Sequence, residues 1–240
     1  CHTPLRYVWD RYDASFGPGR ASPLGRLAIR PVAARLRAWD VRTAARVHRF
    51  AANSAWVAGR IHRYYGRDSV VIPPPVDTVF FSPGADRPGA YDLVVSALAP
   101  YKRLELVLDA YRGTGWPLRI VGTGPEEARL RALAPPEAAF LGRLQDDALR
   151  EEYRGCRAVL MPGVEDAGIV PLEALACARP AVVFGEGGGA ETVEHGVTGL
   201  VFHEPTAAAL RAAVSTLETA RFDRLALRAR AEALRREVFE

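Results

Sequence analysis

Glu165 and Glu173 have a spacing that suits the binding of an anionic ligand. Glu165 follows an expected buried strand at 158–161, and Glu173 lies eight positions further on, within an expected helix over 170–178. A helix start has unpaired N–H groups and a positive dipole end, which suit a diphosphate. Carboxylates separated by about 12 Å along a helix can bind hydroxyl groups on either side of that diphosphate. The same pattern also fits an acidic helix start that only caps itself.

A single lysine adds a positive charge to this group. Lys102 is the only lysine among 32 basic residues, and it follows an expected strand at 91–98. A flexible ammonium group can neutralise the charge of an anion bound at the same edge of the sheet. The unpaired backbone N–H groups at the helix start, those of Gly168, Ile169 and Val170, would form an anion site there. The alternative is an ordinary surface lysine.

The elements that must position these residues follow one another regularly in the second half of the chain. Short apolar runs alternate with helical segments, which predicts right-handed βαβ units and a parallel sheet covered on both faces. The expected strands are 91–98, 118–121, 138–141, 158–161, 181–184 and 200–202, and the expected helices are 104–112, 126–133, 146–154, 170–178, 190–195, 206–219 and 223–237. Residues 91–220 are therefore expected to form a doubly wound α/β domain. Its ligand should lie at the carboxyl ends of the strands.

The first part of the chain predicts a more helical arrangement. Segment 24–51 has apolar residues at helical spacing, and a second helix is expected over 54–65, with Ser54 as its N-cap. A short strand is expected at 70–72. The turn-rich segment 76–90 is expected to link the two parts.

Composition and charge exclude several classes of protein. With 49% hydrophobic and 25% charged residues, the chain is neither a disordered tail nor a disulfide scaffold. Residues 1–88 hold 14 Arg and 6 acidic residues, a net charge of +8, whereas residues 89–240 hold 18 basic and 22 acidic residues, a net charge of −4. A basic first part favours an anionic partner, such as a membrane surface, a phosphate-bearing acceptor or nucleic acid. A solvated basic helix face is the alternative.

The cysteines and histidines show no metal-binding spacing, so we expect no metal site. Cys156 and Cys177 lie in apolar segments, which indicates buried thiols of a cytosolic protein. The chain begins at Cys1, and its only methionine is Met161, which indicates a processed chain or a fragment.

The segment from Glu165 to Glu173 resembles the E-x7-E signature of the retaining glycosyltransferases of family 4, which have the GT-B fold. Further similarity to the family is carried by segments 1–10, 52–77, 100–103, 174–183 and 197–200. The first of these resembles a bacterial subgroup with many mannosyltransferases of surface polysaccharide synthesis. The chain departs from the family's pattern at Ser96, where an arginine is frequent, and at Ala167, where an aromatic residue is usual.

This resemblance implies an α/β fold of the GT-B type. The chain would hold a doubly wound, parallel-sheet donor domain and the C-terminal part of a second, Rossmann-like acceptor domain. The implied parts are a partial acceptor-side domain at 1–75, a linker at 76–90, a nucleotide-sugar-binding domain at 91–220 and a C-terminal crossover helix at 221–240. The family's N-terminal strands are absent from this sequence, so we expect an N-terminally truncated chain.

The resemblance also implies a reaction. A hexose, mannose first, would move with retention from a nucleoside diphosphate sugar, GDP-mannose or a UDP-sugar, to an acceptor hydroxyl in cell-surface polysaccharide or glycolipid synthesis. Neither a metal nor a further cofactor would be needed. Glu165 would orient the transferred sugar, Glu173 would bind the ribose, and Lys102 would stabilise the departing diphosphate.

Further site residues follow from the same resemblance. Arg103 would supply a second positive charge to the diphosphate. The backbone of Gly142, Arg143 and Leu144 would meet the nucleotide base. His2, with Arg6, would face the reaction centre from the acceptor side.

The expected partners are a nucleotide sugar and a lipid-linked or saccharide acceptor. A cytoplasmic location is expected, with peripheral contact between the 24–51 helix and the anionic inner membrane. No nucleic acid is expected, because the chain lacks a recognition motif of aromatic and basic residues. The alternatives left open are a sugar-nucleotide epimerase of the same fold, a non-catalytic fragment that binds nucleotide sugar, and a nucleic-acid-binding protein that uses the basic part.

Overall fold

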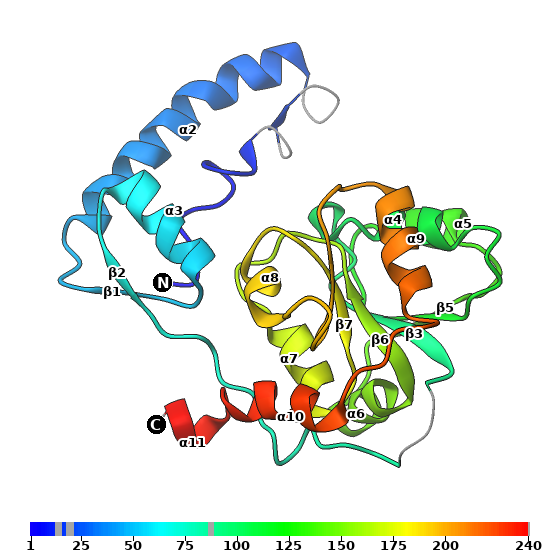
Figure 1. Cartoon of the computed structure of the whole chain (residues 1–240). Coiled ribbons are helices and arrows are strands. Elements are labelled where there is room, and N and C mark those ends of the chain that lie inside the picture. The colour runs from blue at the N-terminus through cyan, green and yellow to red at the C-terminus, as the bar shows by residue number, and fades with distance from the viewer. Residues whose placement is uncertain (13–15, 18–21, 86–88, 240) are drawn as a thin grey trace. The chain divides into compact units, whose positions relative to one another are not determined.

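The computed structural model describes residues 1–12, 16–17, 22–85 and 89–239 (Figure 1). The chain forms two compact units, Cys1–Pro73 and Pro74–Glu240. The roles expected for the parts of the chain stay predictions.

A six-stranded parallel sheet, ordered β5-β4-β3-β6-β7-β8, is the frame of the second unit. Its strands are β3 (Tyr91–Val95), β4 (Leu118–Val121), β5 (Ala138–Gly142), β6 (Cys156–Met161), β7 (Ala181–Phe184) and β8 (Gly199–Phe202). The chain adds β4 and β5 on one side of β3 and then returns to its other side with β6. The doubly wound α/β domain expected from the sequence is therefore confirmed.

Helices cover both faces of this sheet (Figure 1). The second unit contains the helices α4 (Leu104–Tyr111), α5 (Glu127–Leu133), α6 (Asp146–Gly155), α7 (Ile169–Ala176), α8 (Gly188–Thr192), α9 (Ala207–Thr216), α10 (Arg224–Glu232) and α11 (Arg236–Phe239), with a short 3-10 turn, η1 (Pro100–Lys102). Neighbouring strand residues point to opposite faces, so Val94 joins the core under α4 and α9, whereas Leu93 joins the other core, which contains Tyr153 of α6. Burial on both faces explains why the strands are continuous apolar runs.

A buried carboxylate ties the two central strands together at their amino ends. Asp92 of β3 is 1% exposed. Arg157 of β6 donates to both of its oxygens, from Nε at 2.9 Å and from Nη2, and the Tyr111 hydroxyl of α4 donates to Oδ2. A buried charge is tolerated only when it is paired in this way.

The segment expected to be a linker, 76–90, begins inside the second unit. Val76 is buried with Leu172 and Leu227, in a core that joins α7 to α10. Its N–H group donates to the Leu234 carbonyl at 2.9 Å. Arg228 of α10 donates to the carbonyls of residues 78, 81 and 176. These contacts fix α7, which carries Glu173, from the side away from the sheet.

The first unit contains α2 (Pro23–Ala44), β1 (Phe50–Ala52), α3 (Ala55–Tyr65) and β2 (Ser69–Val71). The Ser54 side chain caps α3 as expected, because its Oγ accepts from the N–H group of Val57 at 3.0 Å. The expected helix over 24–51 is wrong in its last part, since α2 ends at Ala44 and residues 50–52 pair in parallel with β2. Phe50 and Ala52 are buried while Ala51 is exposed, a period of two that suits a strand.

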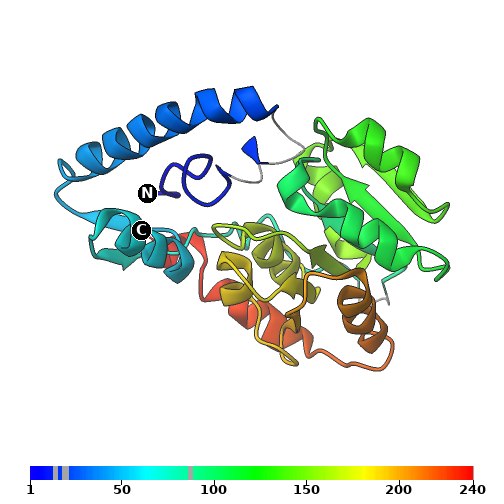
Figure 2. The same ribbon diagram turned by 90° about the horizontal axis from the view of Figure 1, so that it is seen from above.

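The first residues of the chain run beside α2 (Figure 2), and polar side chains attach them to α2 and α3. Trp9 Nε1 and the Tyr65 hydroxyl both donate to Asp40, at 2.8 and 2.9 Å. Arg60, which is buried, pairs with Asp10. None of the helices in the described ranges of the chain is both long and apolar enough to cross a membrane.

Replacing Asp92 by Asn should lower the unfolding free energy by about 3 kcal/mol, because Arg157 would lose its buried counter-charge. Urea unfolding followed by circular dichroism measures this loss. Asp109→Asn is the matched control, since Asp109 pairs with Arg112 on the surface, at 3.2 Å, and such pairs contribute less than about 1 kcal/mol. If Asp92→Asn and Asp109→Asn lowered the unfolding free energy equally, the larger contribution expected of the buried pair would be contradicted.

Candidate functional site

The strand order reverses between β3 and β6, and the two residues expected to act on a diphosphate and its sugar lie there. Lys102 ends η1, which follows β3, and Glu165 lies in the loop after β6. The structure brings them together: Lys102 Nζ lies 2.6 Å from Glu165 Oε1, and the side chains are 19% and 15% exposed. In sheets of this kind, ligands bind in the crevice at such a reversal.

A hollow of about 210 Å³ opens beside this ion pair. It is lined by the ends of β3 and β6, by Lys102 and Glu165, and by Ile169 and Val170 at the start of α7. Ser96 and Ala167, the two positions that depart from the family's pattern, also line it. Lys102 is therefore the cation that this hollow offers to an anion.

The start of α7 adds hydrogen-bond donors to the hollow. Gly168 precedes the helix, and the N–H groups of Ile169 and Val170 are in its first turn, where no intrahelical acceptor exists. Among the hydrogen bonds of the described residues, none uses these two N–H groups. Two backbone donors and a positive helix end therefore lie beside Lys102, which is the arrangement that binds phosphate oxygens.

A glycine-rich turn after β7 supports the loop that carries Glu165. Gly188 donates its N–H group to the Glu165 carbonyl at 2.7 Å. A Cβ atom at Gly188 would lie 2.4 Å from the Asp166 carbonyl oxygen, and one at Gly168 would lie 2.1 Å from Thr192 Oγ1. Both positions therefore require glycine. The sequence alone does not indicate this contact with the Glu165 loop.

Glu173 lies one turn further along α7, and a buried tyrosine binds it. The Tyr153 hydroxyl of α6 donates to Glu173 Oε2 at 2.5 Å. Burial raises the pKa of Glu173 to about 7, the hydrogen bond from Tyr153 opposes that rise, and the negative charge of Asp146 adds to it. Tyr153 was missed in the sequence, where the only signal was its being the one aromatic residue of helix 146–154.

The residues expected to contact the nucleotide base lie to one side of Lys102 and Glu165. Gly142 ends β5 with a φ of +68°, and β5 is separated from β3 by β4, so that it lies about 10 Å away across the sheet. Arg143 is exposed, and Leu144 packs against the core that contains Tyr153. Arg103 follows Lys102, and its guanidinium lies 4.9 Å from the ring centre of Phe184, the last residue of β7. The functions expected of these four residues stay predictions.

His2 is exposed in the first unit, and its expected role at the acceptor side stays a prediction. Cys156 and Cys177 are buried, as expected. Burial raises the pKa of both thiols, that of Cys177 to about 12, which makes them poor nucleophiles. Within the described ranges, no group of three or more His, Cys, Asp or Glu side chains is placed to hold a metal ion.

The sequence is similar to one protein family and to several of the known glycosyltransferases. The family described as "Glycosyl transferases group 1" matches residues 76–234. D-rhamnosyltransferase WbpZ of Pseudomonas aeruginosa is 35% identical over 133 residues, which are 52% of this chain and 35% of that protein. A D-inositol 3-phosphate glycosyltransferase of Geodermatophilus obscurus is 31% identical over 215 residues, 72% of this chain and 47% of that protein. A GDP-mannose-dependent alpha-(1-6)-phosphatidylinositol monomannoside mannosyltransferase of Mycobacterium tuberculosis is 32% identical over 161 residues, 54% and 41% of the two chains. The chain thus spans less than half the length of these relatives.

Solved structures agree on the fold. HepE of Anabaena, in complex with UDP, superposes with a TM-score of 0.70 at 22% identity, over 85% of this chain and 63% of that one. A sucrose-phosphate synthase of Thermosynechococcus elongatus superposes with a TM-score of 0.70 at 22% identity, over 79% and 55%. The expected GT-B-type fold is thereby confirmed.

Glu173 should make the unfolding free energy depend on pH. The pKa of its carboxyl is about 7 in the fold against an ordinary value of 4.5, so the folded state holds the proton more tightly. Its contribution to stability is complete below pH 4.5 and is lost as the pH rises through 7. Relative to Glu173→Gln, the wild-type chain should lose about 3 kcal/mol over this window, as measured by urea unfolding across the pH range. The difference in unfolding free energy between the wild-type chain and Glu218→Gln, at an exposed glutamate, should not change with pH. A difference for Glu173→Gln that also stays constant with pH would contradict the effect of burial on the Glu173 carboxyl.

Proposed function

The chain belongs to the group 1 glycosyl transferases, and from this premise we propose that its second unit binds a nucleoside diphosphate hexose, mannose first, for transfer to an acceptor hydroxyl with retention. The observation that carries the proposal is the Lys102–Glu165 ion pair beside the free N–H groups of α7. Membership of a transferase family does not favour the epimerase alternative.

The Lys102–Glu165 ion pair indicates which contacts a donor would form on binding. Lys102 and Glu165 neutralise each other at 2.6 Å. The diphosphate of an incoming donor would replace the Glu165 carboxylate as the partner of Lys102, with the N–H groups of Ile169 and Val170 holding further oxygens. Glu165 would then be released to accept hydrogen bonds from hydroxyl groups of the hexose, which lies next to the diphosphate in every such donor.

The remaining residues fit the order of groups in a sugar nucleotide. Glu173 lies beyond the start of α7, and it is close enough to Asp146, at the start of α6, for that charge to act on it. Arg143 and Leu144 shortly precede Asp146 in the chain. In the proposed arrangement, Glu173 would lie between the phosphate-binding groups and the loop proposed for the base, and it would bind the ribose.

In the proposed reaction, the bond between the anomeric carbon and the diphosphate oxygen breaks while the acceptor oxygen attacks from the same face. The departing phosphate oxygen takes the acceptor proton. Lys102 and the first turn of α7 stabilise the charge that develops on the diphosphate. A lipid-linked or saccharide acceptor, with His2 on its side of the reaction centre, completes the proposal.

Calorimetric titration of the chain with GDP-mannose, UDP-glucose and UDP-N-acetylglucosamine tests the donor site. One donor should bind, and Lys102→Ala and Glu173→Ala should each weaken it about tenfold or more, since a hydrogen bond to a charged group contributes about 1.5–3 kcal/mol. Arg112→Ala, at an exposed position away from the hollow, should bind like the wild-type chain. Binding that is equal in all four proteins, or absent for every donor, would count against the proposed site.

We also propose that α2 contacts an anionic membrane. Its exposed side chains include large apolar residues and arginines: Leu24, Leu27, Arg30, Val32, Arg35, Leu36, Trp39 and Arg42. Asp40, the one acidic residue of the helix, is occupied by Trp9 and Tyr65. A helix that exposes apolar and basic side chains without free acidic ones suits the headgroup region of anionic lipids.

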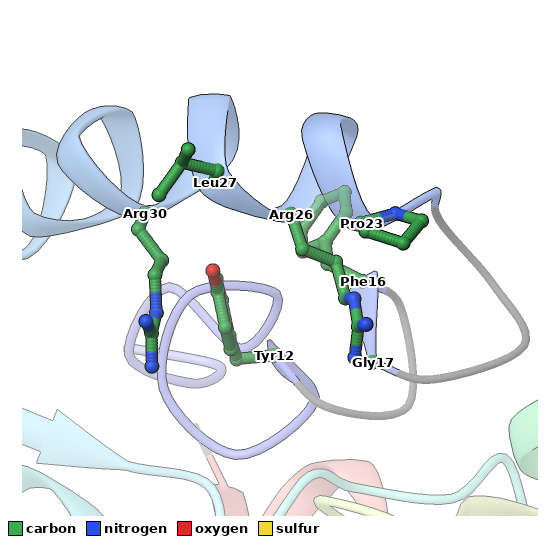
Figure 3. A pocket seen from close by; sticks show the side chains of 7 residues that line it. All are labelled: Tyr12, Phe16, Gly17, Pro23, Arg26, Leu27 and Arg30. Carbon is green, nitrogen blue, oxygen red and sulfur yellow. The ribbon is translucent and has the colours of Figure 1, made fainter.

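Arg37 and Arg26 of α2 are less suited to a membrane contact than the exposed arginines of this helix. Arg37 donates to the Val8 carbonyl at 2.5 Å and lies over the rings of Trp9 and Tyr12. Figure 3 shows Arg26 and Arg30 on either side of Tyr12, in a pocket between α2 and the first residues of the chain. Arg26 is half-buried there, whereas Arg30 remains exposed.

Reversal of three exposed charges tests the membrane contact. The wild-type chain should sediment with vesicles of phosphatidylglycerol and phosphatidylcholine, and the Arg30, Arg35 and Arg42→Glu triple variant should bind about a hundredfold more weakly, since each basic residue contributes about 1 kcal/mol at such a surface. The same reversal at Arg112, Arg129 and Arg221, exposed arginines of the second unit, should have little effect. Absence of wild-type binding would end the proposal.

A further inference from the structure

We infer that Tyr153 is a positioning residue of the donor site, whose hydroxyl holds Oε2 of Glu173 so that the other carboxylate oxygen is presented to the nucleotide ribose. This inference rests on the function proposed above for Glu173. It adds to the site a residue that touches no part of the donor itself and acts only through Glu173.

The position of Tyr153 is set by the core. Its side chain has no solvent exposure, and it packs in the cluster beneath β3 and β6 with Leu93 and Val159. The ring of Phe81 meets it edge-on, with 5.7 Å between ring centres. A buried tyrosine hydroxyl needs a polar partner, and Glu173 Oε2 is that partner, at 2.5 Å. A rigid donor therefore fixes one oxygen of a carboxylate that α7 alone would leave free to rotate.

The hydroxyl also acts on the charge of Glu173. Burial raises the pKa of this carboxyl to about 7, and the hydrogen bond from Tyr153 opposes the rise. The free oxygen of a carboxylate accepts hydrogen bonds from ribose hydroxyls, whereas a protonated carboxyl loses part of that capacity. Without Tyr153, a larger fraction of Glu173 would be protonated at neutral pH, and nucleotide binding would weaken there more than at high pH.

Other charges around Glu173 are few in the described residues. Asp146 of α6 raises its pKa, and Glu173 in turn acts on the Cys177 thiol at the end of α7. The arginines that act on that thiol are Arg150 and Arg154 of α6 and Arg228 of α10. Each of these groups is unchanged when Tyr153 becomes Phe, so the substitution isolates the hydroxyl.

The chain provides a matched control. Tyr111 is 1% exposed, and its hydroxyl also donates to a buried carboxylate, that of Asp92. Asp92 lies at the amino ends of the strands, on the opposite edge of the sheet from Lys102 and Glu165. Tyr111→Phe therefore removes an equivalent buried hydrogen bond without touching the donor site.

The experiment measures the affinity of GDP and of UDP by calorimetry at pH 6, 7 and 9. For the nucleotide that the wild-type chain binds, Tyr153→Phe should raise Kd about tenfold at pH 7 and less than about threefold at pH 9, since hydrogen bonds to charged groups contribute about 1.5–3 kcal/mol. Tyr111→Phe should stay within about twofold at both pH values. In a Glu173→Gln background, Tyr153→Phe should have almost no further effect.

Three results would overturn the inference: equal affinity of Tyr153→Phe and the wild-type chain, an equal loss at every pH, or an equal loss in the Glu173→Gln background. Failure of both nucleotides to bind the wild-type chain would instead reject the proposed function. In that case the titration of Glu173, seen by infrared difference against Glu173→Gln, still decides whether the Tyr153 hydroxyl holds this carboxylate. Its midpoint should move to higher pH in Tyr153→Phe, and an unchanged midpoint would overturn it.

Discussion

The adjacency of β3 and β6 is the constraint on which the rest of the second unit depends. These strands are far apart in the sequence, yet they pair in parallel at the centre of the sheet. Asp92 and Arg157 join their amino ends through a buried ion pair. Because both strands then run in the same direction, the segments that follow them must emerge at the same edge. Lys102 and Glu165 meet there for that reason, and not because of any local sequence preference.

Around this edge, three parts of the candidate site are held by contacts with residues outside the site. The loop of Glu165 is fixed by the backbone of Gly188, and α7 is fixed from behind by Val76 and α10. Glu173 is held by Tyr153, which the core immobilises. Preorganisation of this kind is what makes hydrogen-bond donors and charges effective on a bound anion, because little reorganisation remains when it binds.

Much of this architecture could be predicted from sequence, for physical reasons that differ between elements. The strands at 118–121 and 181–184 have the bounds expected from their apolar runs, since burial on both faces makes the pattern strong. The strand at 50–52 was missed, because three residues carry little local signal and its pairing with 69–71 depends on the helix between them. The spacing of Glu165, Glu173 and Lys102 indicated a shared edge, but not the ion pair. Tyr153 could not be foreseen, because its contact with Glu173 exists only once α6 and α7 are packed.

The ion pair at the sheet edge has a consequence for selectivity. Lys102 and Glu165 balance each other's charge, so an anion would gain the ammonium of Lys102 only by displacing the Glu165 carboxylate. Inorganic phosphate would leave that carboxylate without a partner beside a new negative charge. A sugar diphosphate brings, with its own charge, the hydroxyl groups that the displaced carboxylate requires. Under the proposed function, the Glu165 carboxylate would therefore compete with small anions for Lys102 and would favour sugar diphosphates in a phosphate-rich medium, without any steric barrier.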